Sequence, residues 1–68
     1  IKEAQVQPGD LVFFDNGAGI SHVGIIISAQ KNAIVMIHAS SSKGIVMTDI
    51  YQSTYWKKRI AGFGTFID

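Results

Sequence analysis

Apolar residues recur in five short blocks along the chain, and residues typical of turns separate the blocks. Four blocks, at 11–14, 22–28, 33–39 and 45–50, are rich in the β-branched and aromatic residues that strands favour. The fifth, 60–67, contains two glycines, which indicates a strand bent at those positions. The pattern predicts a mainly β fold of about five antiparallel strands that curl toward a small SH3-like barrel.

One short helix is expected between the fourth and fifth strands. Ser53 can cap a single turn through 54–58, and Lys57 and Lys58 lie at its C-terminal end, where the helix dipole favours cations. Tyr55 and Trp56 belong to the same turn. We expect these two aromatic residues to cover the open end of the sheet, because amphipathic rings often do so.

Two histidines, the only ones in the chain, each lie in a strand that is otherwise almost wholly apolar. Side chains alternate between the faces of a strand, so His22 and His38 share a face only if the hairpin loop has an odd number of residues. A three-residue loop, Gln30–Asn32, with Asn32 at positive φ, meets this condition and sets His22 opposite Ser40 and diagonal to His38. We therefore expect the rings within hydrogen-bonding distance or one water of it.

Such a pair suits proton transfer. A histidine with a near-neutral pKa can take a proton from a nucleophile, and a second polar ring can fix its tautomer. Gly24 lies on the same face without a side chain, so an open slot is expected beside His22. Ser21 and Ser40 flank the rings and are candidates for substrate contact. Taken singly, each histidine is more simply an ordinary core or surface residue.

Composition narrows the classes of protein. A chain of 68 residues forms one small domain that buries about 60% of its unfolded surface, and 47% hydrophobic residues is high for so small an interior. Some apolar surface should therefore meet another segment. The chain starts at Ile1 rather than methionine, which indicates a piece of a longer protein. The longest apolar run, 23–27, is far short of the roughly 20 residues that span a membrane.

Charge and cysteine content argue against several kinds of site. The net charge is +1, and the one basic run, 57–59, is too short to follow a phosphate backbone, so no nucleic-acid partner is predicted. The absence of cysteine removes disulfides and thiolate metal ligands. Two histidines lack a third zinc ligand at a distinctive spacing. No metal or other cofactor is predicted.

Four segments, in order and spacing, resemble the C-terminal half of the NlpC/P60 cysteine peptidases. They are Pro8–Phe14, Ser21–Ile25, Ile37–Ser40 and Tyr55–Ile60, and together they extend over nearly the whole chain. The resemblance implies that 1–68 is the C-terminal β subdomain of an α+β, papain-like domain. It implies a hydrolase that cuts peptidoglycan stem peptides near D-glutamate, with His22 as general base and His38 as the orienting residue.

In that family the nucleophilic cysteine starts a helix in an Asp-Cys-Ser-Gly setting, in an N-terminal helical half that this chain lacks. The chain alone is therefore expected to be inactive, with that half and the stem peptide as its partners. The resemblance also implies an extracytoplasmic location in a bacterium. Two alternatives stay open: a non-catalytic SH3-like module that binds a cell-wall peptide, and a structural fragment with two incidental histidines.

Overall fold

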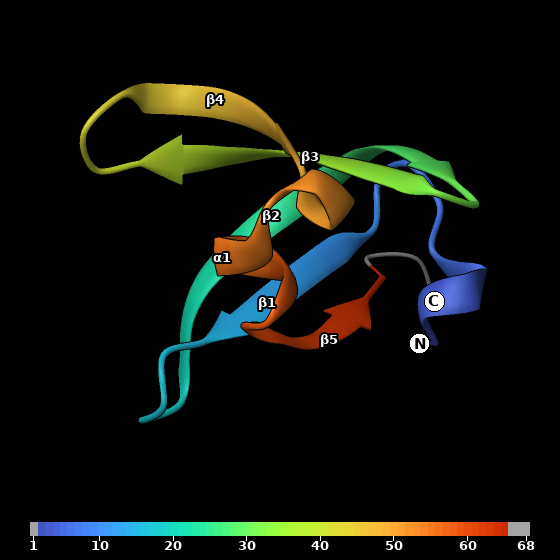
Figure 1. Ribbon diagram of the computed structural model, residues 1–68. Coiled ribbons are helices and arrows are strands. Elements are labelled where there is room, and N and C mark those ends of the chain that lie inside the picture. The colour runs from blue at the N-terminus through green and yellow to red at the C-terminus, as the bar shows by residue number, and fades with distance from the viewer. Residues whose placement is uncertain (1, 66–68) are drawn as a thin grey trace.

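The computed structural model describes residues 2–65 of the chain; the predicted strand positions 66 and 67 lie outside this range. Its elements in order are η1 (Glu3–Gln5), β1 (Leu11–Asp15), β2 (Ile20–Gln30), β3 (Ala33–Ser40), β4 (Gly44–Asp49), η2 (Ile50–Gln52), α1 (Thr54–Lys57) and β5 (Ile60–Gly64) (Figure 1). The predicted strands and the short helix are confirmed. Ser53 caps α1, as expected, because its hydroxyl accepts the backbone N–H of Trp56 at 3.2 Å.

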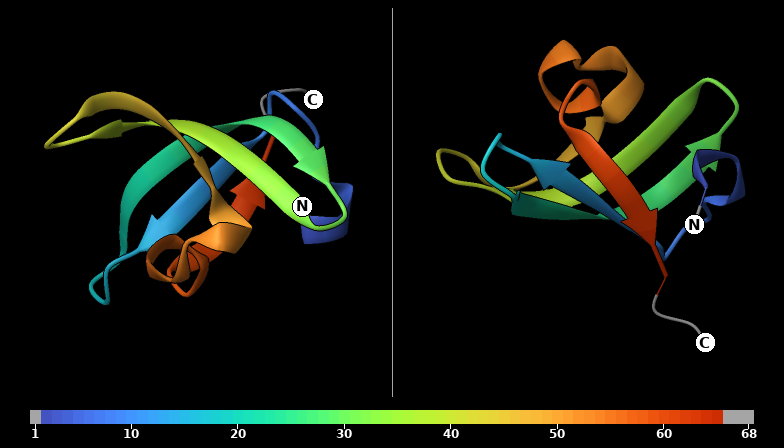
Figure 2. Two further views of the ribbon diagram at one scale, coloured as in Figure 1. Left: turned by 45° about the horizontal axis from the view of Figure 1, so that its top comes forward. Right: turned by 90° about the horizontal axis from the view of Figure 1, so that it is seen from below.

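The strands form one antiparallel sheet in the order β4-β3-β2-β1-β5. β1 to β4 follow one another as a meander, and β5 returns to pair with β1 (Figure 2). The sheet is curved, but β4 and β5 remain its two edges, so within residues 2–65 it does not close into the expected barrel. An open sheet leaves one end accessible, and the two histidines lie near that end.

One face of the sheet, here called the inner face, carries the core. Alternate residues of β1, β2 and β3 point to it, and η2, α1 and the segment before β1 cover it. The core residues are Val6, Val12, Phe14, Ile26, Ile34, Met36 and Ile50, all at most 8% exposed. Trp56 and Ile60 pack against them from the C-terminal part of the chain.

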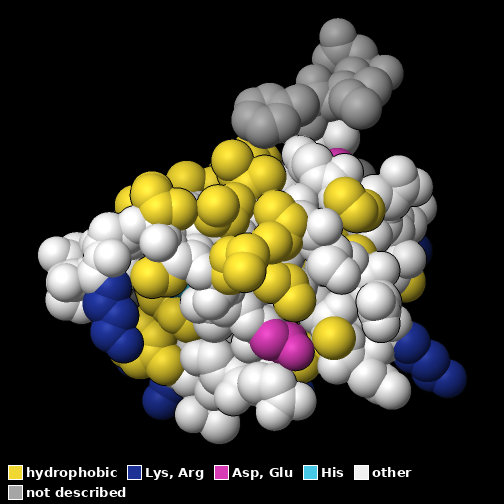
Figure 3. Space-filling view, turned by 90° about the horizontal axis from the view of Figure 1, so that it is seen from above, with side chains coloured by type: hydrophobic (Ala, Val, Ile, Leu, Met, Phe, Trp, Pro, Cys, Tyr) yellow, Lys and Arg dark blue, Asp and Glu magenta, His cyan; other side chains and the backbone are white. Residues whose placement is uncertain are grey.

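The opposite, outer face is also apolar, but residues 2–65 do not cover it. Its outer patch, defined here as Val23, Ile25, Ile45 and Met47, is between 44% and 68% exposed. Ile25 pairs with Ile37, which in turn pairs with Met47, so apolar side chains form a row across three strands. Hydrophobic side chains gather on the surface seen from above in Figure 3. This confirms that the chain holds more apolar surface than it can bury.

The turn between β2 and β3 differs from the prediction. Gln30 pairs with Ala33, so the loop consists of two residues, Lys31 and Asn32, rather than three. Among the described residues only glycines have positive φ, so the expected left-handed Asn32 is also wrong. β3 begins at Ala33 as predicted, whereas β2 extends one residue into the predicted loop, because Gln30 pairs with Ala33.

A β-bulge in β2 compensates for the shorter turn. Ile26 pairs with Met36, the next pair is Ser28 with Val35, and Ile27 has no partner. The extra residue shifts the pairing by one position. Beyond the bulge, the register is therefore the one that a three-residue loop would have given, and the face assignment predicted for the histidines is restored.

Candidate functional site

The two histidines meet on the inner face, at the end of the sheet away from the β2–β3 turn. His22 lies opposite Phe14 of β1, and His38 lies opposite Val46 of β4. His22 Nε2 and His38 Nδ1 are 2.9 Å apart, and the rings are nearly perpendicular, at 88°. The prediction that the rings share a face within hydrogen-bonding distance is confirmed.

Thr48 extends the pair to a chain of three polar side chains. Its Oγ1 lies 2.9 Å from His38 Nε2, so both nitrogens of the His38 ring have partners. Thr48 pairs with Met36 in the β3–β4 ladder, which places it diagonal to His38 on the same face. Sequence analysis missed Thr48, although counting the register back from the Ser40–Gly44 pair would have found it.

Trp56 covers the histidines from α1. Its ring stacks on that of His22 at a centroid distance of 4.8 Å and an angle of 23°, and it meets His38 edge to face at 5.2 Å. The ring of Phe14 packs against the ring of Trp56 at a centroid distance of 4.8 Å. Trp56 therefore fixes the plane of the His22 ring from one side, a contact with the histidines that the sequence did not indicate.

Burial sets the protonation of the second histidine. His38 is only 6% exposed, and desolvation by burial lowers its pKa from 6.5, with the neighbouring His22 lowering it further. A buried imidazole loses the hydration that stabilises its charged form. His38 is therefore held neutral at neutral pH, as a polar partner rather than a second cation.

An open pocket of about 550 Å³ lies over the histidines. The lining residues are His22, His38, Ala39, Ser40, Ser41, Ser42, Lys43, Val46, Thr48, Tyr55 and Trp56. Ser40 is among them, but its hydroxyl already accepts the backbone N–H groups of Ser42 and Lys43 at 3.3 and 3.2 Å. That hydroxyl orders the β3–β4 loop, which the sequence analysis had not connected with the site.

The other two candidates from the sequence lie outside this pocket. Ser21 is exposed on β2 and does not belong to the lining. The slot expected over Gly24 is absent, because Met36 from β3 fills it: a Cβ at Gly24 would lie 2.5 Å from the Met36 sulfur. Gly24 is buried and gives the core room for methionine, and the expectation of an open slot is wrong.

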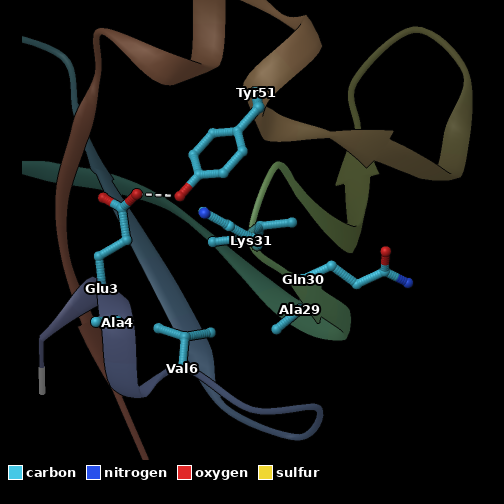
Figure 4. A pocket seen from close by; sticks show the side chains of 8 residues that line it. Glu3, Ala4, Val6, Ala29, Gln30, Lys31 and Tyr51 are labelled. Atoms are coloured by element: carbon cyan, nitrogen blue, oxygen red, sulfur yellow. Dashed lines mark hydrogen bonds between the residues drawn. The ribbon is translucent and has the colours of Figure 1, made fainter.

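A second pocket, of about 530 Å³, lies near the β2–β3 turn and holds no histidine. In Figure 4 the side chains of Glu3 and Tyr51 face each other across it, and the Tyr51 hydroxyl donates a hydrogen bond to the Glu3 carboxylate. This hydrogen bond, with burial and the nearby carboxylates, raises the pKa of Tyr51 to about 12. The two groups satisfy each other, so this pocket offers no comparable proton acceptor.

Within residues 2–65, no group of three or more His, Cys, Asp or Glu side chains is placed to hold a metal ion. The same part of the chain contains no helix of the length and apolarity that crossing a membrane requires. The chemistry available at the site is therefore that of an imidazole pair held under an indole ring, next to an open pocket.

Comparison with known proteins identifies the family of the chain. The sequence model of the NlpC/P60 family matches residues 1–65, and the chain belongs to that family. A Listeria monocytogenes protein named "Probable endopeptidase p60" is 47% identical over 64 residues, which are 94% of this chain and 12% of the relative. "Probable endopeptidase NlpC" of Escherichia coli is 40% identical over 85% of the chain and 36% of that protein.

A third relative, "Murein DD-endopeptidase MepS/Murein LD-carboxypeptidase" of Escherichia coli, is 36% identical over 87% of this chain and 29% of its own length. The chain thus spans between about an eighth and about a third of these relatives. Their names concern proteins of which this chain matches one segment.

Proposed function

We propose that this chain is the C-terminal β subdomain of a peptidoglycan-cleaving cysteine endopeptidase, with His22 as general base and His38 as the residue that orients it. The observation that carries the proposal is the 2.9 Å contact between His22 Nε2 and His38 Nδ1, beneath Trp56 and beside an open pocket. Family membership and the names of the relatives support the reaction class.

In this proposal each nitrogen of His22 has a separate task. Nε2 faces His38, which leaves Nδ1 as the atom that takes the proton from a thiol. When His22 becomes charged, it donates its Nε2–H to His38, and neutral His38 can accept because burial lowers its pKa. Stacking on Trp56 keeps the ring from rotating away, so the base is oriented before the nucleophile arrives.

The nucleophile must come from another segment, because this chain contains no cysteine. We propose that an N-terminal helical half supplies both the thiolate and the oxyanion donors, and that 1–68 alone hydrolyses nothing. The matched relatives extend well beyond the aligned segment, and the uncovered outer patch leaves apolar surface for such a segment to bury. The substrate would be a stem peptide cut near D-glutamate, in an extracytoplasmic compartment.

A graft tests the proposal. This chain would replace the matched segment of the Listeria monocytogenes relative, and release of soluble fragments from purified peptidoglycan would be measured. We expect the graft to cleave, His22→Gln to reduce the rate by about 10²- to 10⁴-fold, as loss of a general base does, and His38→Ala to reduce it less. Lys31→Ala, which changes the other pocket, is the control and should keep full activity.

Two outcomes would count against the proposal. A folded graft whose activity survives His22→Gln would remove the base assignment. A folded graft that binds a muropeptide through the histidine pocket but never cleaves it would favour the non-catalytic binding module, since that function needs the pocket and no proton transfer.

A further inference from the structure

Both ring nitrogens of His38 have a polar partner. One partner is the proposed base, His22, and the other is Thr48, which has no role in the proposal so far. Nδ1 faces His22 Nε2 and Nε2 faces Thr48 Oγ1, each at 2.9 Å. A neutral imidazole carries one proton, so one of its nitrogens donates and the other accepts. The partner at Nε2 therefore influences whether His38 Nδ1 donates a hydrogen bond to His22 or accepts one from it.

The direction of this hydrogen-bond chain follows from the charged state of the base. A protonated His22 has only donors, so its Nε2–H must be accepted by His38 Nδ1. The proton of His38 then lies on Nε2, and that N–H needs an acceptor. In the reverse direction, His38 would donate from Nδ1 to His22, whose own proton would move to Nδ1 and leave no lone pair for a thiol.

Thr48 is placed to accept that N–H. The His38–Val46 and Met36–Thr48 pairs of the β3–β4 ladder fix its Cβ diagonal to the ring. A β-branched side chain in a strand has few χ1 rotamers, so its hydroxyl stays in place. His38 is 6% exposed and has little access to water that could replace the hydroxyl. Ser41 and Ser42 line the same pocket, but the hydrogen-bond partners of the His38 ring are His22 and Thr48.

We propose that Thr48 is a positioning residue that holds His38 in the Nε2–H tautomer and so keeps its Nδ1 free to accept from His22. The part of this inference that concerns catalysis rests on the proposed function. The tautomer does not, because it is a property of the hydrogen-bond chain within residues 2–65. The tautomer assignment and the catalytic role can therefore be disproved separately.

Nitrogen NMR of the histidine rings in the 68-residue chain is the direct test. In the wild type we expect the proton of neutral His38 on Nε2 and none on Nδ1. Thr48→Val keeps the shape and removes the acceptor, so it should shift His38 toward the Nδ1–H tautomer. Thr48→Ser should preserve the wild-type tautomer. Thr54→Val makes the same change at an exposed threonine in α1 and should have no effect.

A wild-type chain with the His38 proton on Nδ1 overturns the proposal, whatever the variants do. So does a Thr48→Val chain that keeps the Nε2–H tautomer while ring contacts between His22 and Trp56 show that it is folded. In the graft, Thr48→Val should lower kcat by about 10- to 100-fold, the size of effect seen when a metal-ligating histidine loses the partner that fixes its tautomer. KM should stay unchanged, and Thr48→Ser should restore most of the rate.

An active graft in which Thr48→Val leaves kcat and the pH profile unchanged would also overturn the proposal. A graft that never cleaves, in a chain whose His38 tautomer responds to Thr48 as described, would instead contradict the proposed function and leave the tautomer assignment intact.

Discussion

The two faces of the sheet contain similar residues and differ almost completely in burial. Ile25 and Ile26 are neighbours on β2, yet Ile25 is 44% exposed on the outer face and Ile26 is 1% exposed on the inner one. The inner face is covered by η2, α1 and the segment before β1, whereas nothing in residues 2–65 covers the outer face. Hydrophobic side chains alone thus do not define a core, because a covering element must also be present.

Polar groups sharpen the contrast. The inner face ends in His22, His38 and Thr48, and every buried side-chain nitrogen and oxygen in the described part of the chain has a hydrogen-bond partner. The outer patch offers only hydrocarbon and a methionine sulfur. The buried polar groups of the inner face are therefore all paired within the described residues, whereas the apolar side chains of the outer patch are exposed.

The largest expected difference is in stability. Ile26→Ala should lower the free energy of unfolding by about 2–5 kcal/mol, since it removes buried methyl groups and leaves a cavity. Ile25→Ala, one residue away, should change it by about 0.5 kcal/mol or less, as exposed substitutions do. Urea denaturation of both variants gives the two values. Equal losses would mean that the outer face is covered, for instance by a second copy of the chain.

The same two variants should behave differently in the isolated chain and in the graft. In the graft, Ile25→Ala should become more destabilising if the remainder of the domain buries part of the outer patch, as proposed above. A persistently neutral Ile25→Ala in the graft would show that this part of the outer patch stays uncovered in the whole domain.

A smaller difference in stability is expected between alanine substitutions at two glycines. A Cβ at Gly24 would meet the Met36 sulfur at 2.5 Å and Val12 at 3.3 Å, so Gly24→Ala should cost about 1–3 kcal/mol through overpacking. At Gly62 on β5 no atom lies within 4 Å of an added Cβ, and Gly62→Ala should stay within about 0.5 kcal/mol of the wild type. Thermal melting of both variants measures the difference. A harmless Gly24→Ala would show that Met36 moves aside freely.

The smallest effect is a pH dependence confined to the inner face. The unfolded chain protonates His38 near pH 6.5, but burial lowers its pKa in the folded chain. As the pH falls below about 6.5, the unfolded state takes up the proton first, so the free energy of unfolding decreases until the folded pKa is passed. His38→Gln should remove this part of the decrease between pH 7 and 5. An unchanged slope in that variant would show that His38 titrates equally in both states.

The sequence predicted the strands, the hairpin and the capped helix because alternation and turn residues mark them locally. It did not predict the bulge, because Ile25, Ile26 and Ile27 form an uninterrupted apolar run in which no change of face is visible. The loop was therefore assigned one residue too many, and the two errors cancelled at His22. Thr48 and Trp56 were not recognised as neighbours of the histidines because they belong to other elements, β4 and α1.

The prediction of an open slot at Gly24 was wrong for a related reason. A glycine leaves space on its own strand, but a neighbouring strand decides whether that space stays empty, and Met36 occupies it. Which residues share a face can be counted along one strand. What fills the space between strands depends on the sizes of side chains that the register brings together.

The unpaired Ile27 and the two-residue turn before β3 together determine the face on which His22 lies. A one-residue slip in a sheet exchanges its two faces, so if Ile27 paired with Met36 while the two-residue turn stayed the same, the bulge would close and His22 would point outward and Val23 inward. Conversely, inserting one residue into the turn while deleting Ile27 would leave the ring contact in place. One residue of length can thus lie either in the bulge or in the turn, and loss of the nuclear Overhauser contact between the two rings would report that the bulge had closed without a longer turn.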